Sequence, residues 1–201
     1  MTVIVVASNI LVQFLLWDGL LTWGAFTYPF AFLVTEIVNR LYGTAAARRV
    51  VLAGFATGIA CSLVGTQVML EFGPAVTLRV AVASATAFLC SQTSDILIFN
   101  RLRRQVWWLA PLVASAASSV VDTAAFFATA FSGALGLFFP AGANAAVAWA
   151  QEATPLLTLG PQMPMWVSLG LADLGVKLVI AMVALLPFRL VVARVLGART
   201  V

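Results

Sequence analysis

Long apolar runs set the strongest limit on what this chain can fold into. Residues 50–70, 78–99, 106–131 and 166–188 each contain at most two charged side chains. A bilayer core about 30 Å thick is crossed by about 20 mostly apolar residues in a helix. With 63% hydrophobic residues, 9% charged residues and a mean hydropathy of +1.07, the sequence predicts an all-α integral membrane protein. We expect residues 1–201 to form a single transmembrane domain.

Two further segments bring the expected number of transmembrane helices to six. Met1–Trp17 can form a first span that ends at Asp18. It lacks the basic start and small-residue cleavage site of a signal peptide, so we expect it to be retained. The next segment, 20–41, contains Pro29, which removes a backbone donor and clashes with the preceding turn. We therefore expect the second span to be broken near Pro29.

The basic residues predict the orientation of these spans. They fall mainly in two loops and the C-terminal tail, which alternation of the spans places on one side of the membrane. By the positive-inside rule that side is cytoplasmic, as are both termini. The apolar stretch 132–165 has no Lys or Arg and should lie outside, with an interfacial helix around 138–149. The basic residues concerned are Arg40, Arg48, Arg49, Arg101, Arg103, Arg104, Arg189, Arg194 and Arg199.

Ionisable residues inside the expected spans need an explanation, because an Asp at a helix centre costs about 2.5–3.5 kcal/mol on insertion scales. The residues concerned are Glu36, Asp95, Asp122 and Asp173. Two of them sit in matching stripes: Ser91, Asp95 and Phe99 have the same i, i+4, i+8 spacing as Ser118, Asp122 and Phe126. Each stripe lies along one helix face. Since the two helices run in opposite directions, the stripes can build a pocket between them.

Simpler structural roles remain open for the same residues. Asp95 and Asp122 can hold helices together by hydrogen bonding to neighbouring Ser, Thr and Gln. Asp173 and Lys177 are four residues apart and can pair with each other or contact a substrate. Glu36 can form a salt bridge with Arg40, which is also four residues away.

Several chemistries find no support in the sequence. There is no His, and the two cysteines, Cys61 and Cys90, are not spaced as metal ligands. No phosphate-binding glycine loop occurs, so neither a cofactor nor ATP hydrolysis by this chain is expected. The basic residues at span ends explain the net charge of +4 without nucleic acid. An intramembrane protease could use Asp95 and Asp122 as paired carboxylates, but the Gly-x-Gly-Asp context is absent, so we expect no enzyme.

Three motifs resemble the queuosine precursor transporter family of bacterial membrane proteins. They read LTWGAFTYPFAFLVTEIVNRLYG, AFLCSQTSDILIFNRLR and WWLAPLVASAASSVVDTAAFF. The resemblance covers residues 1–127, and more loosely the last span with Asp173 and Lys177. It implies a transporter domain in the bacterial cytoplasmic (inner) membrane that imports deazaguanine bases, the precursors preQ0 and preQ1. One departure is Glu36, where the family pattern leads us to expect an aspartate.

The resemblance also suggests roles for individual residues. A guanine-like edge offers adjacent N–H donors to Asp95 or Asp122, its carbonyl needs Gln92 or Asn39 as donor, and its ring needs an aromatic face such as Phe26, Tyr28 or Phe126. The expected substrate-binding residues are Asp95, Asp122, Gln92, Ser91, Ser118, Thr123, Glu36, Asn39, Tyr28, Phe26, Asp173 and Lys177.

Alternatives remain open at the level of the whole protein. The chain could instead be the substrate-binding subunit of an energy-coupling-factor transporter, which has a similar length and needs a separate ATPase. The expected partners are a small-molecule base and the lipid bilayer, and a homo-oligomer is left open.

Overall fold

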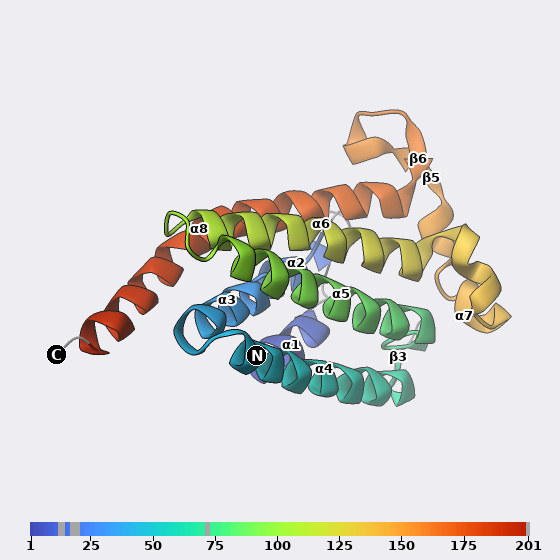
Figure 1. Cartoon of the computed structure of the whole chain (residues 1–201). Helices are drawn as coiled ribbons and strands as arrows, with labels where there is room; N and C mark the ends of the chain where they lie inside the picture. Colours follow the sequence, from blue (N-terminus) through green and yellow to red (C-terminus); the bar gives the residue numbers. More distant parts are fainter. Residues whose placement is uncertain (12–14, 17–20, 71–72, 200–201) are drawn as a thin grey trace.

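Four long helices form the body of the molecule and lie side by side (Figure 1). The computed structural model describes residues 1–11, 15–16, 21–70 and 73–199. The long helices are α4 (Thr44–Gln67), α5 (Leu78–Leu102), α6 (Leu109–Phe131) and α8 (Met165–Arg199). Each is long and apolar enough to cross a bilayer. They correspond to the four apolar runs in the sequence, so this part of the prediction is confirmed.

The first predicted span is not confirmed as a full crossing. Helix α1 (Thr2–Leu11) has 10 residues, about 15 Å at the usual rise and half a bilayer core. It is followed by the strand β1 (Leu15–Leu16), which pairs with β2 (Leu21–Thr22). Asp18, the predicted end of the span, lies outside the described residues. The six predicted spans therefore reduce to four long helices and shorter N-terminal pieces.

The break in the second segment is confirmed. Helix α2 (Gly24–Thr27) is separated by Tyr28 and Pro29 from helix α3 (Phe30–Tyr42). Pro29 takes the N-cap position of α3, where its missing N–H costs nothing within the helix. Gly43 ends α3 with a φ of 85°, a value that glycine adopts readily. The turn at Gly43 starts α4 directly.

The interfacial helix predicted around 138–149 is present only as short helical pieces, and their position at a membrane surface stays a prediction. The connection instead contains the 3-10 helix η1 (Gly133–Phe138), α7 (Ala141–Ala145) and the 3-10 helix η2 (Ala148–Gln151). Pro140 lies between the first two pieces and cannot continue a helix from its preceding turn. The antiparallel strands β5 (Ala153–Pro155) and β6 (Gln162–Pro164) flank η3 (Leu156–Thr158) before α8 begins. A further two-stranded pair, β3 (Met69–Leu70) with β4 (Gly73–Pro74), lies between α4 and α5.

The antiparallel pair α5 and α6 is the centre of the bundle. Helices α3 and α4 pack against α5, and α8 packs against α6 and α3. Helix α1 lies along the second half of α4, where Gly54 has no side chain and so leaves room for Met1 and Phe88. Figure 1 shows the α3–α4 turn, the α5–α6 turn and the C-terminal end of α8 at one end of the bundle. These segments carry the basic residues that the sequence groups on one side.

A buried arginine fixes the opposite end of the bundle. Arg79, in the first turn of α5, is only 3% exposed. Its guanidinium donates to the backbone carbonyls of Thr129 and Ser132 and to Oδ1 of Asn144, at 2.9 Å for the first and the last. It also lies 5.3 Å from the centre of the Phe139 ring. The sequence analysis did not assign a role to Arg79. Its guanidinium binds the C-terminal end of α6 and holds the connection 132–164 against it.

We expect Arg79→Met to destabilise the protein by about 1.5–3 kcal/mol, because hydrogen bonds from a charged donor are lost and buried acceptors remain. Thermal unfolding of the purified protein in detergent measures this change. Proteolytic cleavage within 132–164 should accelerate in parallel. The exposed Arg49, replaced by Met, provides the matched control, and equal stability of the two variants would contradict this role.

Candidate functional site

The two predicted stripes meet across the α5–α6 interface. Ser91 Oγ on α5 donates to Asp122 Oδ1 on α6 at 2.9 Å. Because the helices are antiparallel, a residue one turn after Ser91 in α5 faces a residue one turn before Asp122 in α6. Asp95 therefore lies level with Ser118. In agreement with this register, Phe99 packs in one cluster with Ala114. The two stripes thus face each other across the interface, with serine opposite aspartate, while the pocket expected between them stays a prediction.

A lysine joins two of the carboxylates into a charged triad. Lys177 Nζ on α8 lies 2.7 Å from Asp122 Oδ2 and 2.5 Å from Asp173 Oδ2. Thr123 Oγ1 also donates to Asp173 Oδ2 at 2.9 Å. The side chains of Lys177 and Asp122 are each 5% exposed. The sequence predicted the Asp173–Lys177 pair, but not the bond that ties α8 to Asp122.

Tyr28 closes one side of this triad. Its ring centre lies 5.6 Å from Lys177 Nζ, a distance at which the face of an aromatic ring attracts a cation. Tyr28 sits at the interruption between α2 and α3. The broken second segment thus supplies an aromatic group at the polar centre of the bundle.

The other two carboxylates form a separate buried pair. Glu36 on α3 is 2% exposed and Asp95 on α5 is 0% exposed, and the adjacent Thr35–Gln92 hydrogen bond joins these parts of the two helices. Ser115 Oγ on α6 donates to Glu36 Oε1 at 2.9 Å. The alternative in which Glu36 pairs with Arg40 is wrong, because the Arg40 guanidinium donates to the carbonyl of Arg103. The helix α3 turns Glu36 inward and directs Arg40 to the α5–α6 turn.

Several buried polar atoms around this pair have hydrogen-bonding capacity to spare. Thr35 Oγ1 donates to Gln92 Oε1 at 2.6 Å, which fixes the amide of Gln92. Within the described part of the chain, the buried atoms that make no hydrogen bond are Asn39 Nδ2, Gln92 Nε2, Asp95 Oδ1, Asp95 Oδ2 and Ser118 Oγ. A buried polar group without a partner costs about 1–3 kcal/mol. We call these four residues together with Glu36 the polar cluster; it offers amide donors beside carboxylate acceptors.

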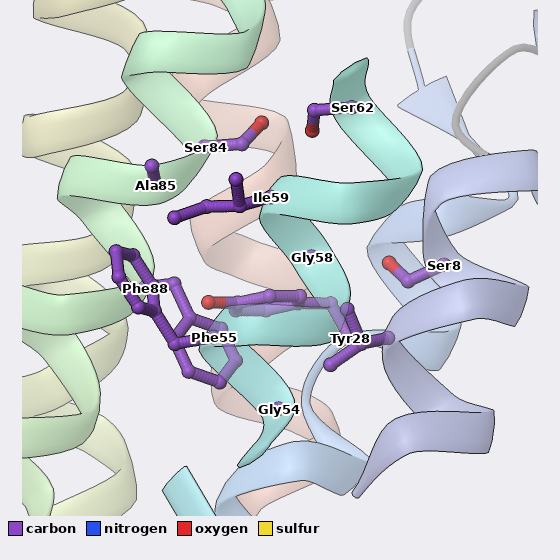
Figure 2. A pocket seen from close by; sticks show the side chains of 11 residues that line it. Ser8, Tyr28, Gly54, Phe55, Gly58, Ile59, Ser62, Ser84, Ala85 and Phe88 are labelled. Carbon is purple, nitrogen blue, oxygen red and sulfur yellow. The ribbon is translucent and has the colours of Figure 1, made fainter. Parts of the chain in front are cut away.

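An aromatic pocket adjoins the polar centre through Tyr28. Its empty volume, open mouth included, is about 380 Å³. Figure 2 shows the rings of Tyr28, Phe55 and Phe88 gathered beside α4, with the hydroxyls of Ser62 and Ser84 at the other end. The ring centres of Tyr28 and Phe88 are 6.2 Å apart, and those of Phe55 and Phe88 are 6.4 Å apart. One wall of the pocket thus carries aromatic rings close to the charged triad.

The predicted aromatic residues divide between this pocket and other places. Tyr28 lines the pocket, whereas Phe26 packs against Trp23 and Phe126 packs against Phe127 and Phe131. Sequence reasoning missed Phe55 and Phe88. The available signal was Gly54 and Gly58 on either side of Phe55, two glycines that line the same pocket.

The predicted site residues therefore fall into two groups around the α5–α6 interface. Among the residues that the structure describes, no three His, Cys, Asp or Glu are arranged to hold a metal ion. The charged triad and its neighbours comprise Asp122, Asp173, Lys177, Thr123, Ser91 and Tyr28. The polar cluster comprises Glu36, Asn39, Gln92, Asp95 and Ser118. Phe26 lies in neither group.

Comparison with known proteins gives a consistent result. Residues 22–192 match the family described as "Putative vitamin uptake transporter". The chain is 38% identical over 122 residues to the "Queuosine precursor transporter" of Escherichia coli (strain K12), covering 55% of each chain. It is 29% identical over 178 residues to the "Probable queuosine precursor transporter" of Haemophilus influenzae, covering 83% of this chain and 66% of the relative. The chain thus spans less than two thirds of the length of these relatives, and no solved structure matches.

We expect Lys177→Met to be strongly destabilising, because it leaves Asp122 and Asp173 buried without their cation. Breaking a buried ion pair on one side costs about 3–5 kcal/mol. The denaturant or thermal unfolding of the purified variant in detergent measures this loss. Adding Asp122→Asn and Asp173→Asn to the same chain should recover a large part of it, and failure to recover any would contradict the charge explanation.

Proposed function

This chain belongs to the "Putative vitamin uptake transporter" family, and we propose that it imports queuosine precursors across the bacterial inner membrane. The proposed substrates are the 7-deazaguanine bases preQ0 and preQ1. The names of the relatives in Escherichia coli and Haemophilus influenzae support this substrate class. The transporter family and the four long apolar helices support a multi-pass membrane protein that is not an enzyme.

The observation that carries the proposal is the polar cluster around Asp95. A guanine-like base presents two adjacent N–H donors and a carbonyl on one edge. Both Asp95 oxygens are buried and accept no hydrogen bond from a donor among the described residues, so they can accept the two donors. The free N–H groups of Gln92 and Asn39 can donate to the carbonyl. Recognition by buried polar groups is selective, because an analogue lacking the edge would leave them unpaired.

The aromatic pocket suits the flat face of the same base. Offset or edge-on aromatic contacts contribute about 0.5–1.5 kcal/mol beyond burial. We assign ring contact to Tyr28, Phe55 and Phe88, which line the pocket together. Tyr28 also contacts the charged triad, whose two carboxylates exceed its single lysine. The aminomethyl base is a cation and is favoured by this excess negative charge.

The orientation follows from the basic segments. The α3–α4 turn, the α5–α6 turn and the end of α8 lie at one end of the bundle (Figure 1). By the positive-inside rule we assign this end, and both termini, to the cytoplasm. The connection 132–164 then lies outside. Arg79 lies at the same end of the bundle, but it is buried and so adds no exposed positive charge there.

Uptake by a strain that cannot synthesise deazaguanines tests this function. Cells that express the chain and receive preQ0 or preQ1 should regain queuosine in their tRNA. Asp95→Asn should reduce uptake at least about tenfold, because losing a charged hydrogen-bond acceptor costs about 1.5–3 kcal/mol. The control is Glu152→Gln, an exposed carboxylate of the outer connection. Uptake that survives Asp95→Asn would refute the role of the polar cluster.

A second measurement addresses the aromatic pocket. We expect Phe55→Leu and Phe88→Leu each to weaken binding of the base about 2- to 12-fold, the range that corresponds to the aromatic contribution. Binding is measured by tryptophan fluorescence or calorimetry on the purified chain. Phe127→Leu, at the far end of α6, is the matched control. Equal effects of all three variants would remove the pocket from the site.

Reconstitution of the purified chain in lipid vesicles separates a self-sufficient transporter from a substrate-binding subunit. A self-sufficient transporter should exchange internal and external base without any added protein. Exchange that requires a copurified ATPase would place the chain in an energy-coupling-factor system instead.

A further inference from the structure

Glu36 and Asp95 form a buried acidic pair without a cation. Both residues are at least nine-tenths buried, and they lie on α3 and α5 close to the Thr35–Gln92 hydrogen bond that joins these two helices. Ser115 is a hydrogen-bond donor to Glu36, while neither oxygen of Asp95 accepts a hydrogen bond from a described residue. Two ionised carboxylates are acceptors only, so they cannot bond to each other. A single proton between them turns one into a donor and satisfies both.

The charged groups on the neighbouring helices are committed elsewhere. On α3, Arg40 donates to the carbonyl of Arg103. On α4, Arg48 is exposed and lines an apolar groove on the outer face of the bundle. On α6, Asp122 lies one turn away, bonded to Ser91 and Lys177.

The remaining neighbour is α8. Its lysine, Lys177, is already shared between Asp122 and Asp173, and Arg189 lies over the ring of Trp107 with its guanidinium carbon 4.8 Å from the ring centre. The ion pairs among the described residues do not include Glu36 or Asp95, and neighbouring like charges in a low-dielectric interior oppose double ionisation.

We propose that Glu36 and Asp95 hold one proton in common and that the pair carries this proton inward together with the imported base. The proposal rests on the import function given above and adds its driving force. With the proton on Glu36, Asp95 stays ionised and can accept both N–H donors of the base. Loss of the proton puts two negative charges side by side. That repulsion favours separation of α3 from α5 and entry of water.

The placement of the pair suits this sequence of events. Glu36 lies in α3, a short helix that starts at the Pro29 interruption and ends at the Gly43 turn. Around Glu36 it is held to α6 by the Ser115 bond and to α5 by the Thr35–Gln92 bond, both from uncharged donors. The charged Arg40 holds only its last turn, through the Arg103 carbonyl. Helix α6, in contrast, is tied to α8 by the Lys177–Asp122 ion pair and by the bond from Thr123 to Asp173. Thus α3 is the element that a change of charge at Glu36 and Asp95 can displace.

Infrared spectroscopy of the purified full chain tests the shared proton without any substrate. At neutral pH the parent should show the carbonyl stretching band of a protonated carboxyl group. The band should be lost in the double variant Glu36→Gln, Asp95→Asn and kept in Glu152→Gln. Identical spectra for the parent and the double variant would overturn the shared proton.

Vesicle transport tests the coupling. With preQ0, a base without the aminomethyl cation, an alkaline interior should drive accumulation about tenfold per pH unit if one proton accompanies each base. Glu36→Gln, which mimics the protonated carboxyl, should still exchange labelled base but no longer accumulate it. Accumulation that ignores the pH gradient, or survives Glu36→Gln, would overturn the coupling.

The two proposals fail in different ways. If the parent neither binds nor exchanges the base, the import function and the coupling both fall, while the infrared comparison still decides whether the pair holds a proton. If the base is exchanged but no gradient drives it, the import function stands and the proton coupling alone is refuted.

Discussion

Among the described residues, the interior of this bundle contains four carboxylates but only one lysine, and this imbalance of charge determines how the polar side chains pair. Lys177 reaches Asp122 and Asp173 but leaves Glu36 and Asp95 to each other. An ionised group in a low-dielectric interior needs a counter-charge or a set of hydrogen bonds. The Lys177–Asp122 ion pair therefore fixes α6 to α8, while the part of α3 around Glu36 is held by hydrogen bonds that involve the uncharged side chains of Ser115 and Thr35. The charged triad therefore holds its helices together more strongly than the polar cluster does, because the lysine lies in the triad.

The fold was largely predictable where a single property dominated. Apolar length identified α4, α5, α6 and α8, and Pro29 marked the interruption before α3. The failures lie where length and composition are ambiguous. The start of the chain is apolar enough for a span, yet α1 ends at Leu11. The stretch 138–149 is rich in alanine, yet Pro140 and packing on the end of α6 divide it into short pieces.

The candidate site was predictable along single helices and less so between them. The i, i+4 rule gave the stripes of α5 and α6 and the Asp173–Lys177 pair. The same rule gave a wrong partner for Glu36, because it ignores the direction in which α3 faces its neighbours. The contacts of Lys177 with Asp122 and of Tyr28 with Lys177 join residues far apart in sequence. Spacing within one helix contains no information about such contacts.

Arg79 has a consequence for how the chain is assembled in the membrane. With the orientation proposed above, its guanidinium must cross the bilayer as α5 inserts, which is costly for a charged side chain. Its acceptors, Thr129, Ser132 and Asn144, are synthesised 50 to 65 residues later. The ribosome synthesises the chain from its N-terminus to its C-terminus, so Arg79 reaches the membrane before its three acceptors have been synthesised. Helices α5 and α6 are thus best inserted as one hairpin, and the biogenesis of the outer end depends on translation reaching the segment that follows α6.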